Sequence, residues 1–237
     1  MIALFAAAAF AGIVGDGAKA FDEGQLDAAI AAWEQARADG GQPSGVVEYD
    51  LGVAWYRKGD LARAAARFRA AGRLRPRDGN VQHNLALARA GLEGVPDPVP
   101  DRGWTEVVTP GEIGVLGVLL AALGSLLVIG GPVVAGGRRA GVGVLATGIA
   151  CGALGAWGAR DQALHPIAVV VDDEVVLRDA ASVDAGERLR LPVGTEVRVV
   201  RAYQGFFLIE DGRDRRGWVA GNAIDLAWGA SGAPSKG

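Results

Sequence analysis

Few side chains in this sequence have the types and the spacing that chemistry at a site requires. The 237-residue chain holds one cysteine, Cys151, and two histidines, His83 and His165, and neither histidine has Cys or acidic neighbours at metal-ligand spacing. We find no Ser/His/Asp or Cys/His set and no glycine-rich loop that would cradle a phosphate. The sequence therefore predicts a protein that is not an enzyme, with no catalytic residues, no metal site and no cofactor.

The composition narrows the kinds of partner. A net charge of −3 gives no basic surplus, so we expect no nucleic-acid binding. Half of the residues are hydrophobic, and the mean hydropathy of +0.22 is high for a soluble protein. The apolar residues concentrate between positions 113 and 159, where Arg138 and Arg139 are the only charged side chains.

Two uncharged runs, residues 113–137 and 140–159, flank this arginine pair. A helix needs about 20 apolar residues to cross a hydrocarbon core of about 30 Å, and both runs are long enough. Gly148 and Gly152 have the spacing that allows close contact between two membrane helices. A buried helix pair in a soluble protein is the alternative, and it fits less well with two uncharged runs joined by so short a link. We predict two transmembrane helices.

Arg138 and Arg139 are the expected topology determinants, because short loops that contain Lys and Arg stay cytoplasmic. Trp104 and Trp157 lie near the outer ends of the two spans, where indole rings favour the interface. The sequence therefore predicts a two-span protein of the bacterial inner (plasma) membrane, with both soluble domains on the extracytoplasmic, periplasmic side.

The apolar N-terminus agrees with this orientation. Residues 1–11 are typical of a signal peptide, and Ala9-Phe10-Ala11 provides a cleavage site. The alternative is an apolar helix that packs on the next domain.

The segment between positions 16 and 93 contains an internal repeat. GQLDAAIAAWEQA at 24–36 and GDLARAAARFRAA at 59–71 match at an offset of 35 residues, so that Trp33 aligns with Phe68. The pattern resembles the tetratricopeptide repeat (TPR), which implies an all-α stack of paired helices. Two features depart from the family: Glu48 replaces a large apolar residue, and Asp16-Gly17 replaces Leu-Gly, so that the first helix looks eroded. A third partial copy, Asn80–Leu92, is predicted to be a capping helix.

Repeat surfaces commonly bind partners, and the second copy carries the candidate binding residues Trp55, Arg63, Arg67 and Arg73. Arg63 and Arg67 are four residues apart, as are Arg69 and Arg73, so they form a basic face on one helix. Acidic residues of the neighbouring repeat, an acidic partner and anionic lipid headgroups could each meet this face. A solvated and partly self-neutralised face is a further alternative.

Residues 94–112 hold four prolines and are predicted to be a semi-extended linker. Beyond the second span, apolar and polar residues alternate in short runs over 166–227, which predicts a small all-β barrel of about five strands. The Val175–Arg178 strand, the LPVGT turn at 191–195, the GFFLI strand and Arg216-Gly217-Trp218-Val219 together resemble a bacterial SH3 (SH3b) domain. That resemblance implies binding of cell-wall peptides or protein segments. Residues 228–237 are predicted to be a flexible tail.

Aromatic side chains are the candidate contacts of this domain. Tyr203, Trp228 and whichever of Phe206 and Phe207 points outward are the first choices, and Trp218 is expected in the barrel core rather than at a ligand platform. Phe206 and Trp218 are both retained as candidate partner-binding residues.

The order of signal peptide, TPR repeats, membrane hairpin and SH3b domain resembles the E-type proteins of Bat aerotolerance operons, as does VQHNLALARA after the last full repeat. The resemblance implies a stress-tolerance complex with von Willebrand-type proteins and a MoxR-type ATPase. We therefore expect a membrane-anchored extracytoplasmic scaffold or adaptor. The alternative is a membrane protein or sensor that binds peptidoglycan through the SH3b domain.

Overall fold

The computed structural model describes residues 2–39, 44–99, 108–130, 137–173 and 175–227. The chain divides into two compact units. The first unit combines Met1–Pro100 with His165–Gly237, and the second is Asp101–Leu164. The predicted repeat and β regions thus belong to one unit, although the two long apolar runs separate them in the sequence. Trp104 and the predicted tail at 228–237 lie outside the described residues.

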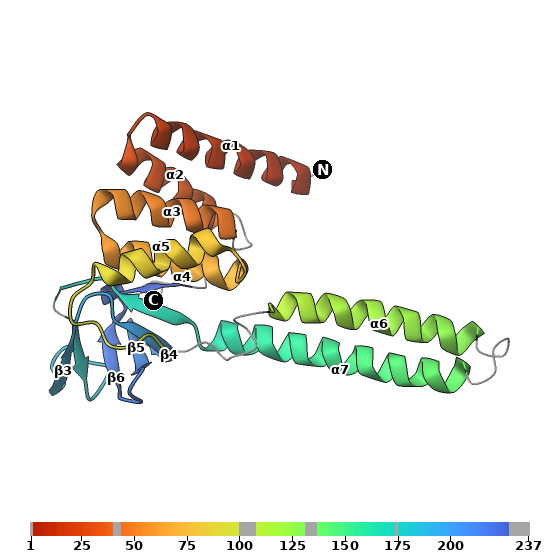
Figure 1. Cartoon of the computed structure of the whole chain (residues 1–237). Helices are drawn as coiled ribbons and strands as arrows, with labels where there is room; N and C mark the ends of the chain where they lie inside the picture. The colour runs from red at the N-terminus through yellow and green to blue at the C-terminus, as the bar shows by residue number, and fades with distance from the viewer. Residues whose placement is uncertain (1, 40–43, 100–107, 131–136, 174, 228–237) are drawn as a thin grey trace. The chain divides into compact units, whose positions relative to one another are not determined.

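The N-terminal part of the first unit is a stack of antiparallel helices (Figure 1). Their bounds are α1 Ile2–Asp22, α2 Leu26–Asp39, α3 Gly45–Lys58, α4 Leu61–Leu74 and α5 Gly79–Ala90. Three of these helices have a short polar residue at the N-cap position. Its side-chain oxygen accepts a hydrogen bond from backbone N–H groups that have no partner within the helix. Ser44 caps α3, Asp60 caps α4 and Asp78 caps α5. Gly59 ends α3 with a φ of 87°, a conformation that favours glycine.

Two glycines allow aromatic rings to fill the space between paired helices. A Cβ on Gly52 of α3 would lie 2.6 Å from Cδ1 of Phe68 on α4. Gly17 of α1 occupies the equivalent place, and a Cβ there would overlap the Trp33 ring of α2. The expectation of an eroded first helix is therefore wrong. Asp16 departs from the repeat pattern, but Gly17, 35 residues before Gly52, retains the close contact that the pattern requires.

The C-terminal part of the unit is one antiparallel sheet. Its strands are β1 Ile167–Val170, β2 Val175–Arg178, β3 Glu187–Leu191, β4 Glu196–Tyr203, β5 Phe206–Asp211, β6 Arg216–Ala220 and β7 Ile224–Leu226. They pair in the order β3-β2-β6-β5-β4-β1-β7. The predicted closed barrel is wrong: β3 and β7 are the two edges of an open seven-stranded sheet. These two strands were not anticipated, because ERLRL and the three-residue IDL each hold only two apolar residues.

The sheet has a core of its own, and β1 is buried on both faces. Ala168 and Val170 belong to the sheet core with Leu177, Val197 and Ile209. Successive strand residues point to opposite faces, so Ile167 and Val169 are directed away from that core. Both are buried, and α4 lies against β1. Strand β1 therefore joins the helices to the sheet.

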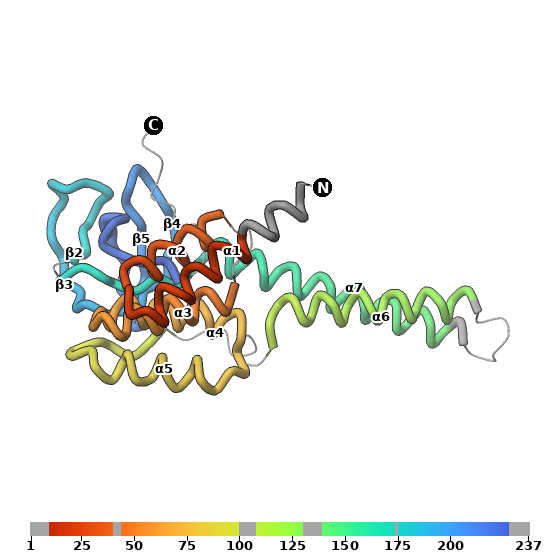
Figure 2. Tube along the Cα trace, turned by 90° about the horizontal axis from the view of Figure 1, so that it is seen from above, coloured from red at the N-terminus to blue at the C-terminus, as the bar shows by residue number. Residues whose placement is uncertain are grey.

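The second unit is a pair of helices, α6 Pro110–Gly130 and α7 Gly137–Leu164, that lie side by side in both views (Figures 1 and 2). Two stretches, Pro110–Ile129 and Arg139–Leu164, are long and apolar enough to cross a membrane. α6 begins earlier than predicted because Thr109 and Glu112 form a capping box: Glu112 N donates to Thr109 Oγ1 at 3.1 Å, and Thr109 N donates to Glu112 Oε2 at 2.8 Å.

The arginine pair is placed differently from the prediction. α7 starts at Gly137, so Arg138 and Arg139 belong to its first turn rather than to a loop. Their role in orientation stays a prediction. Gly148 faces α6 closely, since a Cβ there would overlap the backbone of Ala121, and this agrees with the helix-contact role predicted for it.

The structure also adds detail to two predictions, one for the linker and one for the N-terminal cleavage site. Residues 95–99 form neither helix nor strand, and Val99 is 4% exposed with its carbonyl accepting from Arg69 Nη2 at 2.9 Å, so this part of the linker is held against α4. The predicted cleavage site after Ala11 lies inside α1. Phe10 packs against the core formed by α2 and α3. Cleavage remains a prediction.

Candidate functional site

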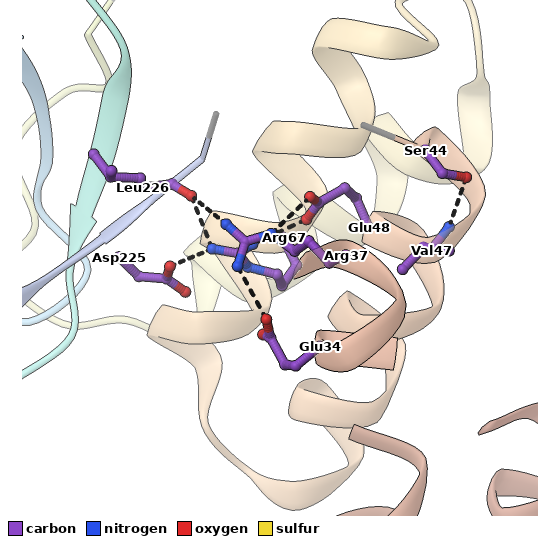
Figure 3. Close-up of polar contacts among 8 residues, drawn as sticks. All are labelled: Glu34, Arg37, Ser44, Val47, Glu48, Arg67, Asp225 and Leu226. Atoms are coloured by element: carbon purple, nitrogen blue, oxygen red, sulfur yellow. Dashed lines mark hydrogen bonds and ion pairs between the residues drawn. The ribbon is translucent and has the colours of Figure 1, made fainter. Parts of the chain in front are cut away.

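A buried arginine connects the helices to the sheet. Arg67 of α4, 0% exposed, donates from Nη1 to Glu48 Oε2 at 3.0 Å and from Nη2 to the carbonyl of Leu226 at 2.9 Å (Figure 3). Nη2 also pairs with the Asp225 carboxylate of β7. Arg37 of α2 completes this Arg67 cluster, donating to Glu48 Oε1 at 3.1 Å and to Leu226 O at 3.4 Å.

The ionisation of the cluster follows from its burial. Burial raises the pKa of the Glu48 carboxyl above its usual value, and the positive charges of Arg67 and Arg37 offset only part of that rise. Burial also acts against the charge of Arg67, but the carboxylates of Asp225, Glu48 and Glu34 outweigh it and raise the pKa of the guanidinium. Arg67 therefore stays charged. Glu48, which departs from the repeat pattern, is the partner that this buried charge requires.

A second set of ion pairs joins the same two parts. Glu196 of β4, 4% exposed, pairs with Arg89 of α5 and lies 3.5 Å from Nε of Arg69. The described residues of the basic face form intramolecular ion pairs, but their acidic partners come from the sheet and from the same repeat rather than from the neighbouring one. The prediction that Arg67 contacts a partner is wrong, because its side chain is fully buried. Arg73 is half-buried on the same helix.

The α3–α4 turn and two loops of the sheet form an open hollow of about 980 Å³, which we call the turn pocket. Trp55, Lys58 and Arg63 line one wall, and Asp172, Asp173 and Val193 line the other. The walls are held together where Leu92 packs on Gly194, whose φ of 85° favours glycine. Two predicted binding residues, Trp55 and Arg63, are thus brought together in a concave site.

The cations of the turn pocket already have partners. Lys58 Nζ pairs with Asp27, and Arg63 Nη1 pairs with Asp60. Both cations also flank the indole of Trp55: Lys58 Nζ lies 5.3 Å and Arg63 Cζ 5.1 Å from a ring centroid. The indole N–H of Trp55 is buried and has no acceptor among the described residues. A buried donor without an acceptor costs about 1–3 kcal/mol, so this wall is not optimised for stability alone.

The outer face of the sheet carries an aromatic pair. Tyr203 at the end of β4 is 53% exposed, and its ring centroid lies 6.3 Å from that of Trp218 on β6. Trp218 is half-buried and alternates with the buried Val219, so its expected place in the core is wrong. Phe206 is half-buried and Phe207 is buried, so Phe206 is the outward member of that pair. Trp228 lies outside the described residues.

Sequence reasoning missed the half of the turn pocket that the sheet supplies. Asp172, Asp173 and Val193 lie in loops more than a hundred residues from Trp55, and no motif marks them. The available signal was the acidic run within AVVVDDEVVLRD, which lies between β1 and β2. Within the described ranges, we find no group of three or more His, Cys, Asp or Glu side chains that could hold a metal ion.

The comparisons with protein families and with curated proteins identify no relative of this chain. The site is therefore interpreted from its own residues.

Proposed function

We propose that this chain is a membrane-anchored adaptor that binds a protein partner in an extracytoplasmic assembly. The observation that carries the proposal is the turn pocket, a concave site formed jointly by the helices and the sheet. The same chain also contains two helices long and apolar enough to cross a membrane. The pocket combines an indole, paired cations and two carboxylates that form no ion pair with a described residue, and this combination suits the recognition of a polar segment. In this proposal the helices resemble TPR repeats and the sheet an SH3b domain.

The resemblance to Bat E-type proteins supports a choice of partners. We propose von Willebrand-type proteins and a MoxR-type ATPase as the members of the stress-tolerance assembly. Arg138 and Arg139 remain the proposed topology determinants.

Photo-cross-linking in native membranes tests the adaptor role. A photoreactive amino acid at Val193, on the pocket wall, should capture a specific protein that mass spectrometry identifies. The same amino acid at Gln82, exposed on α5 away from the pocket, is the matched control. Equal capture at both positions, or none at Val193, would count against this function.

The proposed orientation has a separate test. Alkaline phosphatase fused after Gly237 should be active, because the enzyme matures outside the cytoplasm, and a fluorescent reporter that matures only in the cytoplasm should stay dark. The opposite pattern would place both soluble parts in the cytoplasm.

A second candidate function is binding to peptidoglycan, which the exposed Tyr203–Trp218 pair favours because aromatic faces pack well on sugar rings. The full chain in detergent should then sediment with purified peptidoglycan, and Tyr203→Ala should reduce the bound fraction. Sedimentation that is unchanged in the variant, or absent in both proteins, removes this candidate.

A further inference from the structure

The charges around the turn pocket do not balance. Its two cations are neutralised, Lys58 by Asp27 and Arg63 by Asp60. Asp172 and Asp173, exposed in the connection between β1 and β2, form no ion pair with any described residue. The charge that remains for a ligand is therefore negative.

The rest of the pocket offers apolar surface beside these carboxylates. Leu61 and Leu92 come from the helices, and Val171 and Val193 come from the sheet. A lysine or arginine side chain combines an alkyl stem with a charged head, and it covers apolar surface while its head stays in a polar setting. The pocket presents both surfaces that such a side chain needs.

Two contacts join the helical side of the pocket to the sheet side. Arg67, fully buried, connects α4 to β7, and Leu92 packs on the turn that carries Val193 and Gly194. A preformed site avoids the entropic cost of ordering its walls on binding.

We propose that the turn pocket receives a lysine or arginine side chain from a peptide segment of the partner, with its charged head at Asp172 and Asp173 and its stem against Leu92 and Val193. This inference rests on the proposed function in one respect, that the partner is a protein. It goes further in naming the chemistry that the partner must carry. It also makes recognition depend on helices and sheet together, rather than on two independent binding modules.

Selection from a peptide library tests the proposal without a cellular partner. The full chain is reconstituted in phosphatidylcholine nanodiscs, which carry no net charge, and random dodecapeptides displayed on phage are selected after depletion on empty nanodiscs. The wild type is compared with Asp172→Asn/Asp173→Asn. The matched control is Asp184→Asn/Asp214→Asn, which removes two exposed carboxylates from loops outside the pocket.

We expect Lys and Arg to be enriched among peptides selected on the wild type and on the control. Individual peptides should bind the Asp172→Asn/Asp173→Asn variant at least about ten-fold more weakly by fluorescence anisotropy, as for a lost charge-assisted hydrogen bond. Enrichment of acidic peptides, equal binding to the pocket variant, or no selected peptide would overturn the proposal. If the peptide selection gives one of these results but cross-linking at Val193 still captures a protein, the adaptor role is retained and only the basic ligand is rejected. If cross-linking at Val193 also captures no protein, the adaptor role and the basic ligand are both rejected.

Discussion

The two units of this protein differ in how their helices use glycine, and the first unit also buries charged side chains. In the helical stack, Gly17 and Gly52 make room for aromatic rings, Trp33 and Phe68, and charged groups such as Arg67 are buried as pairs. Between α6 and α7, glycine instead brings backbone against backbone: a Cβ on Gly148 would overlap Ala121, and one on Gly155 would lie 2.7 Å from the N atom of Gly114.

The proposed membrane location of α6 and α7 accounts for the difference. In water, burying an aromatic ring removes apolar area from solvent and drives helices together. Lipid tails are as apolar as leucine, so helices that cross a membrane gain by close backbone approach instead. The outer faces of α6 and α7 agree with this, because large apolar side chains such as Leu119, Leu126 and Ile129 are mostly exposed there. The same residue type thus serves two different modes of association.

The largest expected effect comes from breaking the buried charges of the first unit. Arg67→Ala leaves Glu48 and Asp225 without their common partner, and we expect a loss of about 3–5 kcal/mol in the free energy of unfolding. Urea titration of the full chain in detergent measures it. Arg63→Ala is the matched control, because its pair with Asp60 is partly exposed and should contribute about 1 kcal/mol or less. Equal losses in the two variants would show that burial does not set the strength of these pairs.

A smaller effect is expected from filling the space that an aromatic ring occupies. Gly52→Ala puts a Cβ against the Phe68 ring and should destabilise the helical stack by about 1–3 kcal/mol. Gly72→Ala, also within a helix, meets only Val81 Cγ1 at 3.6 Å and should stabilise by up to about 1 kcal/mol through helix propensity. Thermal unfolding followed by circular dichroism separates the two. Opposite signs are required, and a stabilised Gly52→Ala would contradict the ring-filling role.

If α6 and α7 cross a membrane, as proposed, the corresponding change there should cost less, about 1 kcal/mol, because lipid tails pack against the exposed helix faces when the two helices separate. Gly148→Val adds atoms toward the α6 backbone, whereas Gly143→Val adds them where nothing lies within 4 Å. Hydrogen exchange of α6 amides in nanodiscs should rise for Gly148→Val only. A rise in both variants would mean that side-chain volume matters on every face of α7.

The smallest effect concerns pH within the sheet. Burial acts to raise the pKa of Asp211, but hydrogen bonds from the Arg215 side chain and from the backbone of Arg215 and Arg213 outweigh it and lower the pKa below 3.8. A lowered pKa in the folded state contributes stability above the unfolded pKa, and that contribution is lost as pH falls through the folded value. The stability lost by Asp211→Asn should therefore shrink between about pH 6 and about pH 2. A difference that does not change with pH would assign the loss to hydrogen-bond geometry alone.

Local patterns predicted much of this fold. The 35-residue offset between Trp33 and Phe68 located the helix pairs, since each ring must meet a small residue on the neighbouring helix. Alternation located β4, β5 and β6. Alternation did not show which face of the sheet Trp218 lies on, because an aromatic residue in a strand can pack on either face. Its predicted place in the core was therefore wrong. The sequence pattern also failed for Arg67, which looked like one member of a solvated basic face.

The sequence by itself determined most of the elements: the repeated helices, the two long apolar runs, the strands β2, β4, β5 and β6, and the turn at Gly194. These depend on periodicity and on backbone preferences, which act over a few residues. Only the tertiary structure decided that the sheet joins the helices, that Asp225 and Glu196 neutralise arginines far away in the chain, and that Trp55 shares a pocket with Asp172. The physical reason is that a buried charge requires an oppositely charged partner, which the fold can supply from any part of the chain. The spacing of residues along the sequence therefore does not predict which residue that partner is.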